Sequence, residues 1–586
     1  MWHSSRVPSG YDYTKMTAEQ IKLIGERWHD WYTADWDYGL TTVEFLCACV
    51  GAMTLLHLAS TYRARASFKS TASTRHRAGP LDRLTAGFRF VTSKQWRVQS
   101  LGYYAPPTGS IIGISCIFTF VMALALAARP FYWPNYQMGH SPPLATRSGW
   151  ISIAIMPFMI AFATKVNFVG LLTGVSHERL QAFHRWTALF MYITSLLHTF
   201  PFIVTNIDMG DMVVMYKTSP FYWSGIVALI PQTWLVFMSW GIIRSRYYEV
   251  FKKLHFIATG IFMVALFIHC DFRLTSWDYF WAALAIYCTA WLIQLFRTLY
   301  NSAFGLPYTL EQLSDPHLVQ LTIAAPARFR WAPGQHVFVR ILAAPSLLPF
   351  STHPFTIANV PAEARGDTHD VQLVFRVRRG LTKALQELAL SSPRGRLFLD
   401  GPYGGLPVSL RGYDRVYLLA SGSGATFTVP LLIDLARGFG TGSKCTQATF
   451  VVALRHSGAR RWFEPALADA TARAAAAGVD FAAQIHITSD GSDLESVASA
   501  DSALEKAGGS DAIDDERATQ LGRPHLATLV REACASQRGG RIAFAVCGPA
   551  AFMYDVRNAV AEGQREILDG CSPCEEIFLH AEAYDW

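Results

Sequence analysis

The sequence predicts a multi-pass α-helical membrane domain followed by a soluble half, which combines a small β-barrel with an α/β domain. Composition is the first observation behind this prediction: 51% of the 586 residues are hydrophobic and only 16% are charged, against about 25% charged in average soluble domains. The second observation is that the apolar excess is uneven. Long apolar runs fill residues 39–300, whereas residues 305–586 alternate between polar and apolar like a soluble protein.

The membrane half contains several stretches long enough to cross a bilayer. A spanning helix needs about 20 predominantly apolar residues. We predict seven such spans, at 39–61, 109–128, 149–172, 182–204, 221–243, 254–271 and 276–298. The last six are expected to form one transmembrane domain over 109–300, with the first as an additional helix.

Charge between the spans predicts the orientation. The segment 63–97 contains nine Lys and Arg residues but only one acidic residue, Asp82. Basic loops next to spanning helices remain in the cytoplasm, so we expect 62–108 to be a cytoplasmic loop. The N-terminal segment 1–38 then lies outside, and the half after residue 300 lies in the cytoplasm. Because the basic residues adjoin apolar runs, the net charge of +7 does not indicate a nucleic-acid partner.

The soluble half is predicted to contain two domains. Residues 305–410 are rich in strand-like segments with Gly and Pro between them, such as 337–345 and 371–380, which predicts a β-barrel. Residues 411–586 alternate short apolar strands with helices, which predicts a parallel sheet; the strands are expected at 416–420, 448–454, 481–487 and 541–548. The acidic, Ser/Ala-rich stretch 489–520 is predicted to be a disordered insertion.

Two of the predicted spans contain histidine pairs with the same separation. His184 and His198 are fourteen residues apart in the fourth span, as are His255 and His269 in the sixth. Fourteen residues make almost four helical turns, so each pair shares one helix face and is separated by about 21 Å along the axis. Because both spans run in the same direction, His184 should lie level with His255 near the cytoplasm. His198 should lie level with His269 near the outside.

The repeated spacing favours metal ligands over ordinary core histidines. A lone histidine such as His57 is better explained as a core residue with a hydrogen bond. Ionisable groups within membranes are usually functional, however, and zinc needs four ligands at one point, which the separation of the pairs excludes. Four neutral imidazoles suit two b-type haems with two histidines each. Candidate partners for the haem propionates, with interfacial snorkelling as the alternative, are Arg179, Arg185 and Lys252 inside and Arg129 and Arg147 outside.

Two short motifs in the predicted barrel domain suit a flavin. The sequence HPFTIAN supplies His353, Pro354, Phe355, Thr356, Ile357, Ala358 and Asn359. Its threonine hydroxyl and backbone could hydrogen-bond an isoalloxazine, although the same letters could form a turn. Downstream, Gly380 and Thr382 begin a predicted helix whose N-terminus suits a pyrophosphate, with an ordinary helix cap as the alternative.

The α/β domain contains features of a nucleotide site at strand ends. After the strand at 416–420, the sequence SGSGAT places Gly422, Ser423, Gly424, Ala425 and Thr426 at a strand-to-helix turn, where glycines let the backbone approach phosphates. Arg455 follows the next strand and would suit the 2′-phosphate of NADPH, with a solvated surface as the alternative. Cys547, Gly548 and Pro549 end the last predicted strand, where a nicotinamide should lie.

Taken in order, these motifs resemble the ferric reductase and NADPH oxidase superfamily over roughly residues 105–586, and most closely the fungal ferric-chelate reductases. Further similarities are the extra N-terminal span, the segment 522–526 and the aromatic tail EAYDW. The resemblance implies a two-haem membrane core and a ferredoxin–NADP reductase-like module. By the same resemblance, His184, His198, His255 and His269 are haem ligands and Trp586 shields the flavin.

The function implied by this resemblance is a plasma-membrane metalloreductase. Electrons would pass from cytoplasmic NADPH through FAD and two b-type haems to ferric, or cupric, chelates outside, in support of iron uptake and its transport partners. Cys547 and Trp586 would contribute to catalysis at the flavin. The rival hypotheses are an NADPH oxidase that makes superoxide and a non-enzymatic membrane scaffold, which should lack a haem spectrum.

Overall fold

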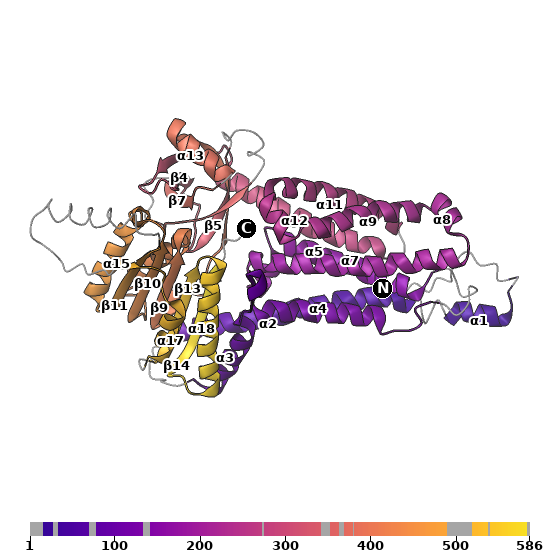
Figure 1. Ribbon diagram of the computed structural model, residues 1–586, viewed down its shortest axis with the longest axis horizontal. Helices are drawn as coiled ribbons and strands as arrows, with labels where there is room; N and C mark the ends of the chain where they lie inside the picture. The colour runs from indigo at the N-terminus through magenta and orange to yellow at the C-terminus, as the bar shows by residue number, and fades with distance from the viewer. Residues whose placement is uncertain are drawn as a thin grey trace, which may run out of the picture. The chain divides into compact units, whose positions relative to one another are not determined.

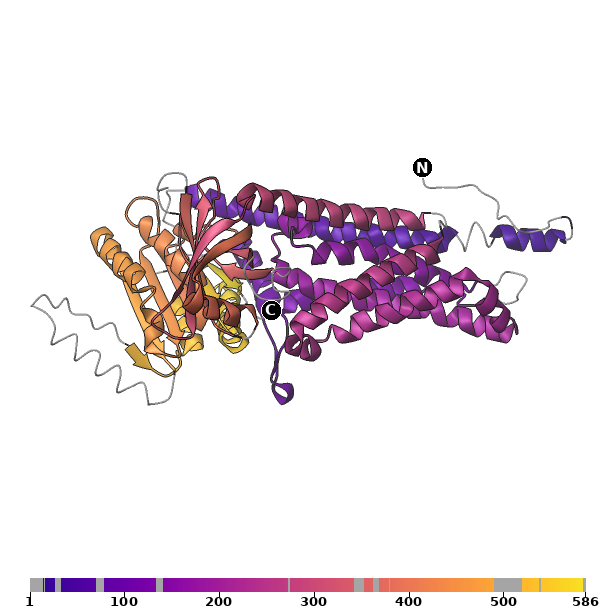
Figure 2. The same ribbon diagram turned by 90° about the horizontal axis from the view of Figure 1, so that it is seen from above.

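The structure is a computed structural model, drawn in Figures 1 and 2, and it describes most of the chain. The described residues are 14, 16–26, 33–69, 78–132, 141–271, 275–341, 352–361, 368–378, 380–488, 519–536 and 539–582. The chain divides into two units, one formed by 1–58 with 110–293 and the other by 59–109 with 294–586.

Within the described residues, seven helices are long and apolar enough to cross a membrane, in agreement with the seven predicted spans. Four shorter helices accompany them: α1 (Ala18–Glu26), α6 (Phe168–Thr173), α8 (Met212–Thr218) and α10 (Gly241–Arg246). The seven are α2 (Thr33–Lys69), α4 (Thr108–Leu126), α5 (Pro143–Ala163), α7 (His177–Asp208), α9 (Pro220–Met238), α11 (Tyr248–Cys270) and α12 (Ser276–Ser302).

Two of the predicted span boundaries are wrong. The third span was expected to continue to residue 172, but α5 ends at Ala163 and a new helix, α6, begins after Asn167. The Asn167 side chain accepts a hydrogen bond from the Gly170 amide at 2.8 Å and so caps α6. The fifth span was expected to reach residue 243, but Trp240 has extended backbone angles and separates α9 from α10.

The core of the membrane unit lies around α5. Its residues Ile151, Ala154, Ile155 and Met156 have no exposed surface. In this unit α7 packs most closely on α5, and α11 packs most closely on α9. Because neighbouring helices enclose α5, their side chains reach its backbone carbonyls, each of which has a second lone pair that can accept a hydrogen bond.

The six-stranded barrel begins directly after α12. All its strand pairs are antiparallel in the order β6-β5-β8-β3-β4-β7, and an isolated bridge between Ile357 and Leu373 joins the two ends. Both strands predicted there are present, as β5 and β7. The elements are β3 (Leu306–Gln312), β4 (Leu318–Pro326), β5 (Gln335–Ile341), β6 (His353–Thr356), β7 (Thr368–Arg376), α13 (Leu381–Ser391) and β8 (Arg394–Gly404).

The α/β domain is a parallel sheet of order β12-β11-β10-β9-β13-β14 with helices on both faces. The four predicted strands are confirmed as β9 (Arg415–Ser421), β10 (Gln447–Leu454), β11 (Asp480–Ile487) and β13 (Gly540–Cys547). One face carries α14 (Ala425–Arg437) and α15 (Glu464–Ala477), and the other carries α17 (Leu526–Ala535) and α18 (Ala550–Asp569) (Figure 1). The strand order reverses between β9 and β13, which is where such sheets bind ligands.

Two strands of this sheet were not predicted, β12 (Thr519–Leu521) and β14 (Cys574–Glu582). The predicted disordered insertion is therefore wrong at its last two residues, because Thr519 and Gln520 pair with β11. The remainder of that prediction, 489–518, lies outside the described residues.

The basic segment expected as a cytoplasmic loop contains regular structure and belongs to the same unit as the sheet. It holds α3 (Pro80–Ser93) and a short hairpin of β1 (Arg97–Val98) and β2 (Tyr103–Tyr104). Helix α3 packs along α18, and its residue Ala86 lies in the core beneath α17 and α18. In Figure 1, α3 lies beside α18 although some 460 residues separate them in the chain.

Candidate functional site: paired histidines and a nucleotide pocket

The four predicted ligand histidines meet as two facing pairs inside the membrane unit. The ring centroids of His184 on α7 and His255 on α11 are 6.4 Å apart, and those of His198 and His269 are 5.8 Å apart. Two imidazole nitrogens that share one metal at about 2 Å each place their rings roughly 6 Å apart. The pairing and the level of each histidine therefore agree with the sequence prediction.

Hydrogen bonds fix the protonation of three of these imidazoles. The Nδ1 atoms of His184 and His198 each lie 2.8 Å from a backbone carbonyl, of Met159 and Ala145 respectively. The Nδ1 of His269 lies 3.0 Å from the Phe221 carbonyl. Because a carbonyl can only accept, each Nδ1 carries the proton and each Nε2 keeps a lone pair for a metal.

Two glycines that sequence reasoning missed make room for the outer pair. A Cβ added to Gly149 on α5 would lie 2.6 Å from Nδ1 of His198, and one added to Gly225 on α9 would lie 3.1 Å from Cε1 of His269. Any larger residue would push these rings out of place. The sequence did contain a signal for these positions, because a glycine inside an apolar helix indicates that another group packs closely against its backbone.

A buried arginine, Arg147, lies close in sequence to the residue that binds His198 of the outer histidine pair. Arg147 is 1% exposed and follows Ala145, the acceptor for His198, by two residues. Its Nη2 donates to the Ala128 carbonyl at 3.1 Å, and its Nε has no partner in the described part of the chain. A buried cation without an anion is costly, so Arg147 suits the propionate of a haem held by His198 and His269. The other outer candidate, Arg129, stacks over Phe131 at 4.5 Å.

These observations fit haem better than a single metal ion. No group of three or more His, Cys, Asp or Glu side chains that could hold an ion occurs among the described residues. Each pair offers two ligands from opposite helices, which suits a planar group with two axial positions.

The predicted flavin motif lies on β6 at the edge of the barrel. Thr356 pairs with His336 of β5, so their side chains share one face of the sheet. His336 also lies against Tyr403 of β8, with ring centroids 5.9 Å apart and nearly parallel planes. Phe355 packs against Phe375 at 4.9 Å. These two aromatic rings beside the predicted flavin position, His336 and Tyr403, were not predicted from the sequence.

The carboxylate of Asp400 joins the Tyr403 ring to the end of α12. Both carboxylate oxygens of Asp400 accept from the Tyr403 hydroxyl, and Gln294 and Arg297 donate to them at 2.7 and 2.8 Å. Burial lowers the pKa of His336 even though Glu582 and Asp400 act in the other direction. His336 is therefore a neutral imidazole at pH 7, able to accept or donate a hydrogen bond.

The rest of the HPFTIAN motif has structural roles. Ile357 has no exposed surface and forms the bridge to Leu373 that closes the barrel. Ala358 is 5% exposed, and its amide donates to the Gln372 carbonyl at 2.7 Å. The Asn359 amide group donates to Asp370 and accepts from Gln372. These three side chains are therefore occupied within the barrel, and the first four residues of the motif remain as candidates for the flavin.

Gly380 caps α13 and leaves open space at its N-terminus. Its φ of +71° lies in the region that favours glycine, and a Cβ there would meet nothing within 4 Å. Thr382 accepts a hydrogen bond from the Arg378 amide at 2.8 Å. This helix start offers free backbone donors to a pyrophosphate.

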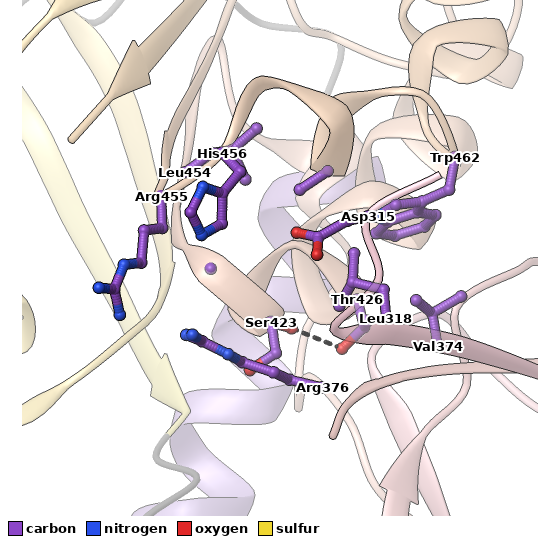
Figure 3. Close-up of a pocket in the computed structure, with 12 residues that line it drawn as sticks. Asp315, Leu318, Val374, Arg376, Ser423, Thr426, Leu454, Arg455, His456 and Trp462 are labelled. Carbon is purple, nitrogen blue, oxygen red and sulfur yellow. Dashed lines mark hydrogen bonds between the residues drawn. The ribbon is translucent and has the colours of Figure 1, made fainter. Parts of the chain in front are cut away.

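The nucleotide motif forms one wall of a pocket at the carboxyl ends of β9 and β10, which strands β4 and β7 of the barrel also line (Figure 3). Gly422, with φ +57° and nothing within 4 Å of its Cβ position, opens toward this space. Gly424 has a different reason to be glycine, because a Cβ would lie 2.3 Å from the Cys547 carbonyl oxygen. Thr426 also lines this pocket, and its hydroxyl donates to the Ser423 carbonyl at 2.8 Å. Ala425 is 1% exposed and begins α14.

Arg455 lies in this pocket as predicted, together with residues that the sequence analysis missed. In Figure 3, Arg455 and Arg376 extend toward one side of the pocket while Trp462 lies on the other. The two guanidinium groups provide positive charge next to the turn after β9. Other lining residues not foreseen are Asp315 and His456.

Cys547 ends β13 and is fully buried between Ala420 of β9 and Glu582 of β14. It therefore lies at the carboxyl edge of the sheet, as predicted. Gly548 follows it, and a Cβ there would approach the Phe552 ring to 2.8 Å. Pro549 then caps α18. The other residue predicted to act in catalysis, Trp586, lies outside the described residues.

Three family models match the chain in the order of its domains. They are the ferric reductase like transmembrane component over residues 148–266, an FAD-binding domain over 306–406 and the ferric reductase NAD binding domain over 413–561. Together they cover three of the four paired histidines (all but His269), the barrel and the nucleotide sheet without β14. The fold expected from the sequence, a membrane ferric-reductase core joined to a reductase module, is therefore confirmed.

Curated relatives carry the same kind of name. The chain is 31% identical over 433 residues to the "probable cell surface ferric reductase kap2" of Aspergillus oryzae, covering 69% of this chain and 57% of that protein. It is 28% identical over 364 residues to "Ferric/cupric reductase transmembrane component 7" of Saccharomyces cerevisiae, covering 60% and 56%. The chain thus spans little more than half the length of these relatives. A solved FAD/NAD-binding domain of nitric oxide dioxygenase from Vibrio cholerae aligns with 48% of this chain and 99% of its own, at 15% identity and a TM-score of 0.31.

Proposed function

This chain belongs to the ferric reductase family, and from that premise we propose that it passes electrons from NADPH across a membrane to ferric chelates, with cupric chelates as further acceptors. The observation that carries the proposal is the two facing imidazole pairs, in which three of the four Nδ1 atoms donate to carbonyls and leave Nε2 available to a metal. The pairs are about 21 Å apart along the helices, which spans most of the roughly 30 Å hydrocarbon core.

Bound FAD would exchange electrons in pairs or singly, and haems with two histidine ligands would carry single electrons without binding oxygen at iron. In this proposal His184 and His255 hold the inner haem, and His198 and His269 hold the outer one. His353, Pro354, Phe355 and Thr356 position the flavin ring.

The nucleotide residues have separate tasks. Gly380 and Thr382 bind the FAD pyrophosphate, while Gly422 and Ser423 line the space for NADPH. Gly424 and Gly548 let the turns after β9 and β13 pack closely beside that space. Arg455 attracts the 2′-phosphate, and Cys547 marks the sheet edge where the nicotinamide approaches. Trp586 is proposed to cover the flavin until NADPH arrives.

The orientation follows from the basic segment between α2 and α4. Placed inside by its nine Lys and Arg residues, it leaves residues 300–586 in the cytoplasm and the outer haem facing the exterior. The cell surface name of one relative favours the plasma membrane. Reduced iron released there would serve uptake by a separate transport protein.

The test is haem content in the purified full chain. We expect two b-type haems per chain, and His198→Ala should lose one of them while NADPH still bleaches the flavin absorbance. His57→Ala is the matched control: this lone intramembrane histidine lies against Gly174, and its loss should leave both haems in place. Two haems in His198→Ala would contradict the assignment. Superoxide formation without iron, together with no ferric reduction, would favour the oxidase instead.

A further inference from the structure

One side of α3 is apolar and uncovered. Leu81, Leu84, Phe88 and Val91 recur at the spacing that places residues on one helix face. They are 67%, 71%, 54% and 47% exposed, and Trp96 just after the helix is 58% exposed. A contiguous row of large exposed apolar side chains marks an interaction surface. We call these four residues the α3 stripe.

The opposite side of α3 is held by the nucleotide-binding domain. Ala86 is 3% exposed within the core shared with α17 and α18, and Gly87 lies against Leu568. Arg89 forms an ion pair with Glu576 of β14 at 2.9 Å. Beyond the helix, Gln95 and Asn558 exchange two hydrogen bonds. Because this side is fixed, α3 cannot rotate to bury its stripe.

The positive charge around the α3 stripe indicates what kind of partner the stripe binds. Residues 59–109 contain nine Lys and Arg residues, and their one acidic residue, Asp82, is paired with Arg63. A positively charged amphipathic helix favours an anionic surface. A second copy of this chain would bring the same positive charge to the same face, which opposes association.

The short link between α2 and α3 allows α3 to reach the surface of the bilayer that α2 crosses. Helix α2 has 37 residues, about 55 Å in length, whereas the hydrocarbon core is about 30 Å thick. Its last turns carry Arg63, Arg65 and Lys69, which belong outside the hydrocarbon. Residues 70–79 join Lys69 to Pro80, and a link of this length spans at most about 40 Å.

We propose that α3 is an interfacial helix whose stripe inserts into an anionic lipid leaflet while its other side stays on α18. The helix then joins the bilayer surface directly to the nucleotide-binding sheet. Trp96 would lie at the level of the lipid headgroups, where aromatic rings with a polar edge are enriched. The proposal does not depend on electron transfer, since it concerns only the surface that covers α3.

The test places a photo-crosslinking amino acid at Leu84 in the full chain, reconstituted in nanodiscs of phosphatidylcholine and phosphatidylserine. Illumination should give adducts with the mass of a phospholipid, and a probe at Phe88 should behave in the same way. The matched control is a probe at Leu390 on α13, which is 75% exposed and lies outside the α3 stripe. We expect several-fold more lipid adduct at Leu84 than at Leu390, and less when phosphatidylserine is omitted.

Two other results of the crosslinking experiment would contradict the proposal. A crosslinked dimer from the Leu84 probe would show that a second copy covers the stripe. Reaction of the Leu84 and Phe88 probes only with water, as at Leu390, would show that the stripe faces solvent. The mass of the adduct separates these results, and none of them needs NADPH, haem or ferric chelate.

Discussion

Replacing Glu576 with glutamine should destabilise the nucleotide-binding domain, because this carboxylate holds two arginines from different parts of the chain. Its Oε1 lies 2.9 Å from Nη1 of Arg89 on α3, and its Oε2 accepts from Nη2 and Nε of Arg541 on β13 at 2.6 and 2.9 Å. The exposed fractions of the three side chains are 25%, 29% and 13%. Exposed pairs contribute about 0–1 kcal/mol, and breaking a buried pair costs about 3–5 kcal/mol. We expect Glu576→Gln to cost about 2–3 kcal/mol, between these limits.

The assay is thermal unfolding of the purified full chain in detergent, followed by intrinsic fluorescence. For a domain of this size, a loss of about 2–3 kcal/mol lowers the melting temperature by roughly 5–10 °C. Arg89→Met should cost about half as much, because Arg541 still pairs with Glu576. In the double variant the two losses should not add, since the residues share one interaction.

The pH dependence of this effect has a definite sign. Burial alone would raise the pKa of Glu576, but Arg89 and Arg541 hold it below its usual value. The unfolded chain therefore binds more protons below about pH 5, so the stabilisation is complete at neutral pH and disappears as the pH falls through the lowered pKa. The difference between wild type and Glu576→Gln should shrink at acid pH.

The control is Asp469→Asn, which removes an exposed pair with Arg473 on α15 and should leave the melting temperature unchanged. The reasoning would be refuted if Glu576→Gln melted with the wild type. It would also be refuted if Glu576→Gln and Arg89→Met were strictly additive.

Three further outcomes follow from the sites. Gly149→Leu should expel the outer haem, because even a Cβ would come within 2.6 Å of His198; absorbance should show one b-type haem per chain, and two would contradict the packing. Arg147→Met should also reduce haem content, and added haemin should fail to bring it back to the wild-type level if the guanidinium binds a propionate. Arg455→Ala should raise KM for NADPH about tenfold or more, from a lost charge-assisted hydrogen bond of about 1.5–3 kcal/mol. KM for NADH should change little, and equal effects on both coenzymes would remove Arg455 from the 2′-phosphate site.

Much of the fold could be predicted from local patterns. Runs of apolar residues gave the seven spans, and short apolar runs with intervening helices gave four strands of the parallel sheet, because each depends on neighbouring residues only. The predicted ends of the spans were less accurate. Asn167 caps a new helix and Trp240 has extended backbone angles, and neither feature can be predicted from the apolar content of a segment. Strand β14 was missed because its sequence, CEEIFLHAE, neither alternates between polar and apolar residues nor forms one continuous apolar run.

By itself, the sequence determined the spacing of four histidines, the helices that carry them and the order of the flavin and nucleotide motifs. These depend on helical geometry and turn chemistry, which act over a few residues. Only the tertiary structure decided which carbonyls three of the imidazoles engage, why Gly149 and Gly424 cannot carry side chains, and how Arg147 is buried. It also placed Arg89 against Glu576, 487 positions away. Such contacts depend on which distant surfaces meet, and no local pattern encodes that.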